Sequence, residues 1–128
     1  IGNAASVALG DPESVPAGQY GKQALESLGL WDQVENKLSL GTNVTEVLNW
    51  VAASSAQAGI VYATDAASMA DKVEVVAEAP EGSCDKVLYP AGVLKDSKNP
   101  EAAKVLMSFL QTNKAAEVFE AAGFTIVE

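Results

Sequence analysis

Apolar residues follow two spacings along this chain, and the two spacings alternate. Short apolar or β-branched runs bounded by Gly, Pro and Asp predict buried strands near Val7–Leu9, Gly59–Tyr62, Val73–Ala77 and Val87–Val93. Apolar positions at helical spacing predict helices from Pro16 to a stop at Gly29, from Val44 to Ser55, from an Asp65 cap through Met69, from an Asn99–Pro100 cap to about Thr112, and from Asn113 to Gly123. Strands that alternate with helices predict an α/β fold with a mostly parallel sheet.

Some helix boundaries carry local signals of their own. Pro16 suits a first helical turn, where a missing N–H costs little. Asn43 offers a capping side chain, and Glu46 follows three residues later, as in a capping box. We expect residues 30–40 to connect elements with some extended character and residues 124–128 to finish extended. No repeat, low-complexity tract or linker interrupts the pattern.

Charge and composition narrow the function classes. The 128 residues are one domain's length, and they carry a net charge of −9 with only eight Lys and Arg residues. So few basic residues argue against binding nucleic acid or an anionic membrane surface, although neutral donors can still bind a small anion. His is absent and Cys84 is the single cysteine, so His-based triads, histidine metal sites and an internal disulfide are excluded. We interpret Cys84 as incidental.

Two predicted helix starts and one strand end carry the candidate chemistry. Pro16-Ala17-Gly18 and Thr42-Asn43-Val44 each present backbone N–H groups at the positive end of a helix dipole. Tyr62 follows the strand that ends near Val61, and ligands of open α/β sheets collect outside the carboxyl ends of strands. Together these positions offer only neutral hydrogen-bond donors, a set that suits a desolvated oxyanion.

Each of these features also has an ordinary structural interpretation. Most helix starts bind only water, and Tyr62 fits equally well as a tyrosine at the edge of the core. Asp11, Asp65 and Asn43 are typical caps and turn residues, and Trp31 and Trp50 are typical packing anchors. The residues alone therefore allow an anion binder and go no further, because the ordinary structural interpretation of each feature is the more common one.

Four segments together resemble the periplasmic molybdate-binding proteins of ABC transporters. They are "GDPESVPAGQYGKQALESLGLWD", "NVTEVLNWVAASSAQAGIVYATDA", "KVLYPAGVL" and "AAEVFEAAGFTIVE". The patterns GDP-x3-PAG-x-Y, GIVY-x-TDA and the closing GFTI occur in that family's order and spacing. The resemblance covers essentially the whole chain, and the combination is specific although each piece is weak.

The resemblance implies a type II periplasmic-binding-protein lobe that binds molybdate or tungstate without a counter-cation. Ala17 and Val44 correspond to backbone donors, and Tyr62 corresponds to a hydroxyl donor. The implied protein is not an enzyme and needs no cofactor and no directly bound metal cation. It delivers the oxyanion to a membrane permease from the periplasm, or from a membrane tether in a Gram-positive source.

Members of that family exceed 200 residues and form two lobes around an interlobe cleft. By resemblance, residues 1–93 are the second lobe, and residues 94–128 are a C-terminal segment that packs on the first lobe. The first lobe supplies two serine donors, so this chain is expected to hold half a site. Its apolar C-terminal stripes are expected to make the isolated chain dimerise or exchange this segment between copies.

Other functions stay open at this point. A different oxyanion such as sulfate would use the same donors. The size of the cavity decides between sulfate and molybdate, and the sequence does not give that size. The same bilobal fold also serves as an effector-sensing domain fused to a helix-turn-helix, and no such motif is visible here. An enzyme is the weakest alternative, because no His and no cluster of carboxylates offers an acid–base pair.

Overall fold

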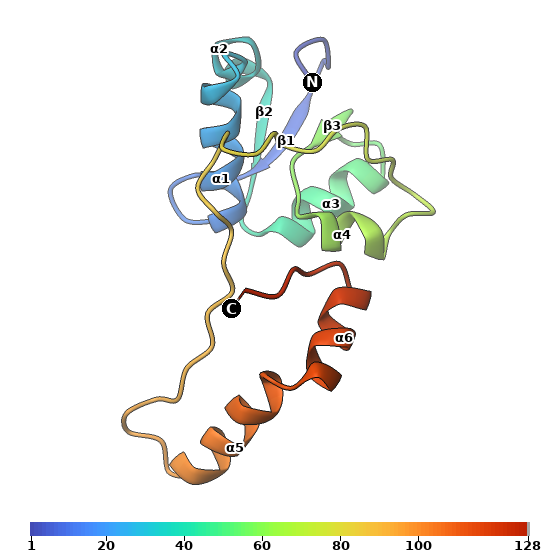
Figure 1. Cartoon of the computed structure of the whole chain (residues 1–128). Coiled ribbons are helices and arrows are strands. Elements are labelled where there is room, and N and C mark those ends of the chain that lie inside the picture. The colour runs from blue at the N-terminus through green and yellow to red at the C-terminus, as the bar shows by residue number, and fades with distance from the viewer. Residues whose placement is uncertain (128) are drawn as a thin grey trace. The chain divides into compact units, whose positions relative to one another are not determined.

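The computed structural model describes residues 1–127 and divides them into two compact units, Ile1–Val87 and the residues from Leu88 onward (Figure 1). The first unit holds a sheet and four α-helices, and the second holds two helices. Over residues 1–127, no helix combines the length and the apolar character required to cross a bilayer.

The first unit is built on three parallel strands in the order β2-β1-β3. β1 (Val7–Gly10) is central and pairs with β2 (Leu38–Gly41) from Val7↔Leu38 to Gly10↔Gly41. The short β3 (Ala58–Gly59) pairs with the start of β1. All four residues of β1 are buried, as expected of the middle strand of a parallel sheet covered on both faces.

Helices cover both faces of this sheet. They are α1 (Pro16–Ser27), α2 (Trp31–Val34) with the 3-10 turn Glu35–Lys37, α3 (Val44–Ala52) and α4 (Ala63–Ser68). Successive side chains of a strand point to opposite faces, so Val7 and Ala8 enter different clusters. Val7 packs with Leu25 and Val34 below α1 and α2, whereas Ala8 packs with Val47 and Ala56 below α3.

Glycines let α1 approach β1 closely. A Cβ atom on Gly18 would lie 2.0 Å from the Gly10 carbonyl oxygen, so only glycine fits where the first turn of α1 meets the end of β1. One turn later, a Cβ on Gly21 would lie 2.6 Å from Leu9 Cδ1. Gly18 and Gly21 of "PAGQYG" therefore serve the packing of α1 on β1.

The predicted helices are confirmed with small shifts of their ends, and so is the strand at Val7–Leu9. The expected strand Gly59–Tyr62 is shorter and is paired only over Ala58–Gly59. Residues 30–40, predicted to be a connector, hold α2, the 3-10 turn and β2. The Asp65 cap is wrong: Tyr62 is the N-cap of α4, and Asp65 lies inside its first turn.

The strands predicted over Val73–Ala77 and Val87–Val93 are wrong, because both segments lack secondary structure. A strand needs a hydrogen-bonding neighbour, and among residues 1–127 neither segment has a ladder partner. Val76 is consequently 85 % exposed. The stretch between α4 and the end of the first unit is held to α1 by Asp85, whose backbone N–H and Oδ2 contact the Gln23 amide at 2.8 and 2.9 Å.

The second unit consists of α5 (Pro100–Leu110), α6 (Asn113–Ala121) and the extended residues on either side. Thr112 Oγ1 caps α6 by accepting the Ala115 N–H, whereas Asn99 is the N-cap of α5 without a capping side-chain bond. Phe124 makes edge-on contacts with Tyr89 and Phe119, at 5.5 and 6.1 Å between ring centroids. α5 buries none of its residues, although its apolar stripe has helical spacing. The end of the expected extended tail, Glu128, lies outside the described residues.

The contact between Gly18 and Gly10 gives a prediction for stability. Gly18→Ala forces the start of α1 away from β1, and we expect a loss of about 1–3 kcal/mol in the free energy of unfolding, the usual range for overpacking. The sign of this change in the free energy of unfolding is diagnostic, because Gly→Ala at an unconstrained helical site stabilises the protein by about 1 kcal/mol. Urea denaturation measures it, with Gly92→Ala as the control, since a Cβ on Gly92 meets nothing within 4 Å. An unchanged or raised stability for Gly18→Ala would contradict the packing account.

Candidate functional site

Three helices of the first unit begin just after the three strands end (Figure 1). The chain passes from β1 to α1, from β2 through the single turn at Thr42-Asn43 to α3, and from β3 to α4. Because the strands are parallel, their carboxyl ends lie at one edge of the sheet. The positive ends of three helix dipoles therefore lie along that same edge.

The start of α1 is fixed by a turn at Asp11. The Asp11 carbonyl accepts the Ser14 and Val15 N–H groups at 3.1 and 2.8 Å, and its carboxylate accepts the Glu13 N–H at 2.9 Å. Pro16 occupies the first helical position and Ala17 the second. Within the described residues no hydrogen bond engages the Ala17 N–H, and Ala17 is only 5 % exposed. The first N–H groups of a helix have no partner within it, so this amide is free to donate to an external acceptor.

The start of α3 is a capped turn, as its sequence predicted. Asn43 Oδ1 accepts the Glu46 N–H at 2.9 Å. The Glu46 carboxylate reaches back to Thr42 and accepts from both its N–H (2.8 Å) and its hydroxyl (3.0 Å). Val44 is the first helical residue, and its N–H and that of Thr45 have no acceptor in the part of the chain that the structure describes. These two amides are therefore unengaged donors at the start of α3.

The start of α4 is built on Tyr62. Its carbonyl accepts the Asp65 and Ala66 N–H groups, each at 3.1 Å, which makes Tyr62 the N-cap of this six-residue helix. Asp65 Oδ2 is buried and has no hydrogen-bond partner within the described residues. The positive end of a helix dipole attracts a nearby carboxylate. At the start of α4 this position is already occupied by the side chain of Asp65.

The three helix starts hold no basic residue. Neither Lys nor Arg occurs in the segments 11–18, 41–47 and 60–66, which do contain Asp11, Glu13, Glu46 and Asp65. Neutral N–H groups donate and cannot accept, so they suit an oxyanion that carries no proton on the oxygens they bind. Recognition then depends on the placement of the donors, since a point-charge counter-ion is absent from these segments. Across residues 1–127, no group of His, Cys, Asp and Glu side chains could hold a metal ion.

The structure thus places Ala17, Val44 and Tyr62 at three helix starts on one edge of a single sheet. The sequence predicted these three positions as ligand donors, which stays a prediction, and it gave no sign of the contacts that hold the helix starts in place. Nothing in the sequence indicated the close contact between Gly10 and Gly18 beyond the small size of the two residues. The reach of Glu46 to Thr42 could have been found, because "TNVTE" contains both a capping-box pair and a second hydroxyl one residue earlier.

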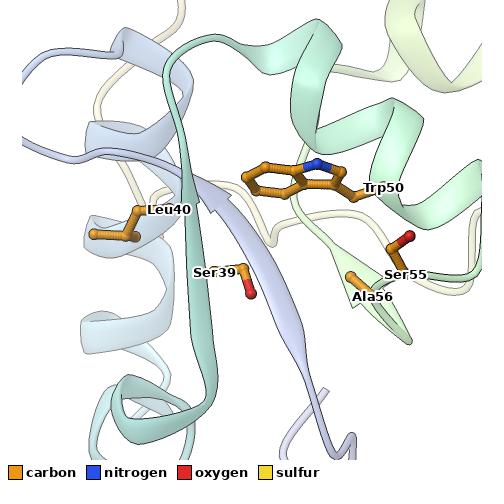
Figure 2. Close-up of a pocket in the computed structure, with 5 residues that line it drawn as sticks. All are labelled: Ser39, Leu40, Trp50, Ser55 and Ala56. Carbon is orange, nitrogen blue, oxygen red and sulfur yellow. The ribbon is translucent and has the colours of Figure 1, made fainter.

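Two hollows lie elsewhere, along β2. One, of about 270 Å³, is lined by Ser39, Leu40, Trp50, Ser55 and Ala56 (Figure 2). The other, of about 390 Å³, lies between β2, α1 and α2 and is lined by Asp11, Pro12, Glu13, Lys22, Trp31, Glu35, Leu38 and Leu40. Neither contains Ala17, Val44 or Tyr62, although the second contains Asp11 and Glu13 from the turn that precedes α1.

Comparison with known proteins gives the class. Residues 2–125 match the family of bacterial extracellular solute-binding proteins. The chain belongs to this family, whose members bind solutes and are not enzymes. As ABC-importer binding proteins, they act outside the cytoplasm.

Named relatives narrow the class further. The chain is 45 % identical over 119 residues to the putative ABC transporter substrate-binding lipoprotein YvgL of Bacillus subtilis, a match that covers 93 % of this chain and 45 % of YvgL. It is 43 % identical over 124 residues to the molybdate-binding protein ModA of Escherichia coli, covering 97 % of this chain and 48 % of ModA. The chain therefore spans about half the length of the relatives it matches.

Solved structures agree on the fold. The substrate-binding domain of a putative molybdenum ABC transporter from Clostridium difficile superposes with a TM-score of 0.80 at 38 % identity, over 98 % of this chain and 54 % of that one. The periplasmic molybdate-binding protein of Azotobacter vinelandii superposes with a TM-score of 0.84 at 22 % identity, over 98 % and 56 %. The predicted α/β fold of the binding-protein type is confirmed, and here too the match covers about half of each neighbour.

Proposed function

We propose that this chain forms one lobe of the substrate-binding component of an ABC importer for molybdate or tungstate. One observation carries the proposal: three helix N-termini without basic residues lie at one edge of a parallel sheet, and the N–H of Ala17 at one of them has no acceptor within the described residues. The names of the relatives, molybdate-binding in E. coli and molybdenum transporter in C. difficile, support the choice of anion.

In this proposal the oxyanion accepts hydrogen bonds from the Ala17 and Val44 amides and from the Tyr62 hydroxyl. Residues 1–93 make the second lobe, and the first lobe supplies the facing donors across the cleft. Closure of the two lobes around the anion removes water, which strengthens each neutral hydrogen bond. A tetrahedral dianion is then selected by size and by donor geometry.

The partner of the whole protein is the membrane permease of an ABC transporter. The names of the A. vinelandii and B. subtilis proteins suggest two settings, a periplasmic protein and a membrane-tethered lipoprotein. In both settings the binding protein meets its anion outside the cytoplasm and hands it to the permease.

Calorimetric titration of molybdate, tungstate and sulfate tests the function. We expect the full-length two-lobe protein to bind molybdate and tungstate saturably and sulfate more weakly, because the named relatives are molybdate-binding proteins. The 128-residue chain has only part of the donor set, so we expect no saturable binding at micromolar anion. Tight binding by the isolated chain would contradict the half-site, and a preference for sulfate would reassign the anion.

The individual donors are tested in the full-length protein. Val44→Pro deletes one N–H at the first helical position, where proline is tolerated, and the preceding Asn43 is already extended (φ −161°, ψ 165°) as a residue before proline requires. We expect the affinity for molybdate to fall by about 1–3 kcal/mol, roughly 5- to 150-fold. Val44→Ala keeps the N–H and should bind like the wild type, and Tyr62→Phe should lose a similar amount to Val44→Pro. Equal affinities for Val44→Pro and Val44→Ala would remove Val44 from the site.

Self-association of the isolated chain is a further part of the proposal. Val105, Leu106 and Val118 are 71, 57 and 66 % exposed, and α5 buries no residue. The proposal assigns these side chains to the interface with the first lobe, which leaves them open to a second copy when that lobe is absent. We expect the 128-residue chain to dimerise, or to exchange residues 94–128 between copies, with increasing concentration. Sedimentation equilibrium measures this, and a monomer at high concentration would contradict it.

A further inference from the structure

The side chain of Glu46 ties the end of β2 to the first turn of α3. Its Oε2 atom accepts the Thr42 N–H at 2.8 Å and the Thr42 hydroxyl at 3.0 Å. Asn43 closes the turn from the other side, because its Oδ1 accepts the Glu46 N–H at 2.9 Å and its Nδ2 donates to Thr42 Oγ1 at 3.3 Å. These bonds join Thr42, Asn43 and Glu46 into one closed network.

This network differs from an ordinary capping box by one residue. In the ordinary box, the carboxylate at the third helical position accepts the N–H of the N-cap residue itself. Asn43 is the N-cap of α3 and Glu46 is its third helical residue, yet the carboxylate accepts the N–H of Thr42, one position earlier. Within residues 1–127, the N–H groups of Asn43, Val44 and Thr45 consequently have no acceptor.

The Val44 amide lies inside the segment that the network closes. The peptide that carries this N–H joins Asn43 to Val44. Before it, Thr42 is bound to the Glu46 carboxylate, and after it, the Glu46 N–H is bound to Asn43 Oδ1. Backbone held on both sides has little rotational freedom left to lose, whereas the ends of helices otherwise fray. The network therefore sets the direction of the Val44 N–H before any ligand arrives.

The same turn is also connected to the start of α1. The Gly41 carbonyl, one residue before Thr42, accepts the N–H of Asp11 at 2.8 Å. Space at this point is limited, since a Cβ atom on Gly41 would lie 3.1 Å from Val47 Cγ2 and 3.4 Å from Glu46 Oε2. A shift of the turn would therefore change the separation between the start of α3 and the start of α1.

The negative charge of Glu46 works against an anion at this helix start. Like charges repel, and a carboxylate accepts hydrogen bonds but donates none, so Glu46 gains nothing from an unprotonated oxyanion. What the side chain contributes is an acceptor for the two donors of Thr42. A neutral amide oxygen can fill that role as well, so the geometric effect and the charge can be separated by substitution.

We propose that Glu46 is a positioning residue of the anion site, which acts through Thr42 to fix the direction of the Val44 N–H and does so by its acceptor oxygen rather than by its charge. The inference rests on the proposed function, because it takes Val44 as a donor to the oxyanion. It assigns control of the affinity to a side chain that makes no hydrogen bond to the anion itself.

Two variants of the full-length protein test this role. Glu46→Ala and Glu46→Gln both remove the charge, but only glutamine keeps an oxygen that accepts from Thr42. In calorimetric titrations of molybdate at one ionic strength, we expect Glu46→Ala to bind about fivefold more weakly than Glu46→Gln, a ratio equivalent to one helix cap. Glu46→Gln should bind as tightly as the wild type or more tightly. An affinity of Glu46→Ala equal to or above that of Glu46→Gln would overturn the inference.

Stability is measured alongside affinity. Circular dichroism shows whether each variant is folded, and urea denaturation gives its free energy of unfolding. A cap that only stabilises α3 would lower that free energy and leave the affinity of the folded protein unchanged, whereas a positioning residue changes the affinity of variants that are fully folded.

A second pair of variants tests the route through Thr42. Thr42→Val removes the hydroxyl that donates to Glu46 and keeps the branched shape, whereas Thr42→Ser keeps the hydroxyl. We expect Thr42→Val to bind molybdate about threefold more weakly than Thr42→Ser, and Glu46→Ala to cost less affinity in the Thr42→Val background than in the wild type. Equal costs in the two backgrounds would overturn the route through Thr42. If Glu46→Ala fails to fold, equal affinities for Thr42→Val and Thr42→Ser would overturn the inference.

The wild type separates this inference from the function on which it rests. If the full-length wild type shows no saturable binding of molybdate, the proposed function is overturned and the role of Glu46 falls with it. If the wild type binds and Glu46→Ala matches Glu46→Gln, only the role of Glu46 is overturned.

Discussion

The close packing of the first turn of α1 against the end of β1 sets the frame of the candidate site. It requires glycine at position 18, because any side chain there would overlap the Gly10 carbonyl. At the same point the Asp11 N–H binds the Gly41 carbonyl at 2.8 Å and ties the end of β1 to the end of β2. The starts of α1 and α3 are thereby linked through backbone contacts, while the side chains of Asp11, Asn43 and Glu46 hold the two turns themselves. Donors held in this way are preorganised, which is what a site without charged ligating groups needs.

Neutral donors also explain how an acidic protein can be suited to an anion. The net charge of −9 acts at long range, where salt screens it beyond about 8 Å at physiological ionic strength. At a helix N-terminus the partial positive charge of about one half acts at contact distance and falls off within one turn. Asn43 and Glu46 occupy some of the amides around the start of α3 and leave Val44 and Thr45 unengaged. The local field at the donors and the overall charge of the chain are therefore separable properties.

Two predicted strands do not form, and the apolar face of α5 is exposed, for the same physical reason. Val73–Ala77 and Val87–Val93 have strand-forming sequences, and α5 has an amphipathic one, yet the strand segments find no ladder partner and α5 buries no residue. Propensity selects a conformation only when a neighbour supplies hydrogen bonds or an apolar surface. These segments agree with the observation that the chain spans about half the length of its relatives.

The sequence by itself determined the features that depend on neighbours close in the chain. These are the helix spacing, the proline at the start of α1, the Asn43 cap with Glu46 and the buried run of β1, and with them the α/β class. The donor roles of Ala17, Val44 and Tyr62 stay a prediction. Tertiary structure alone decided which strands form, in which order they pair, and that Gly18 is required by a carbonyl eight residues earlier. The reason is that caps and periodicity act within a few residues, whereas strand pairing and close packing require partners that only the folded chain brings together.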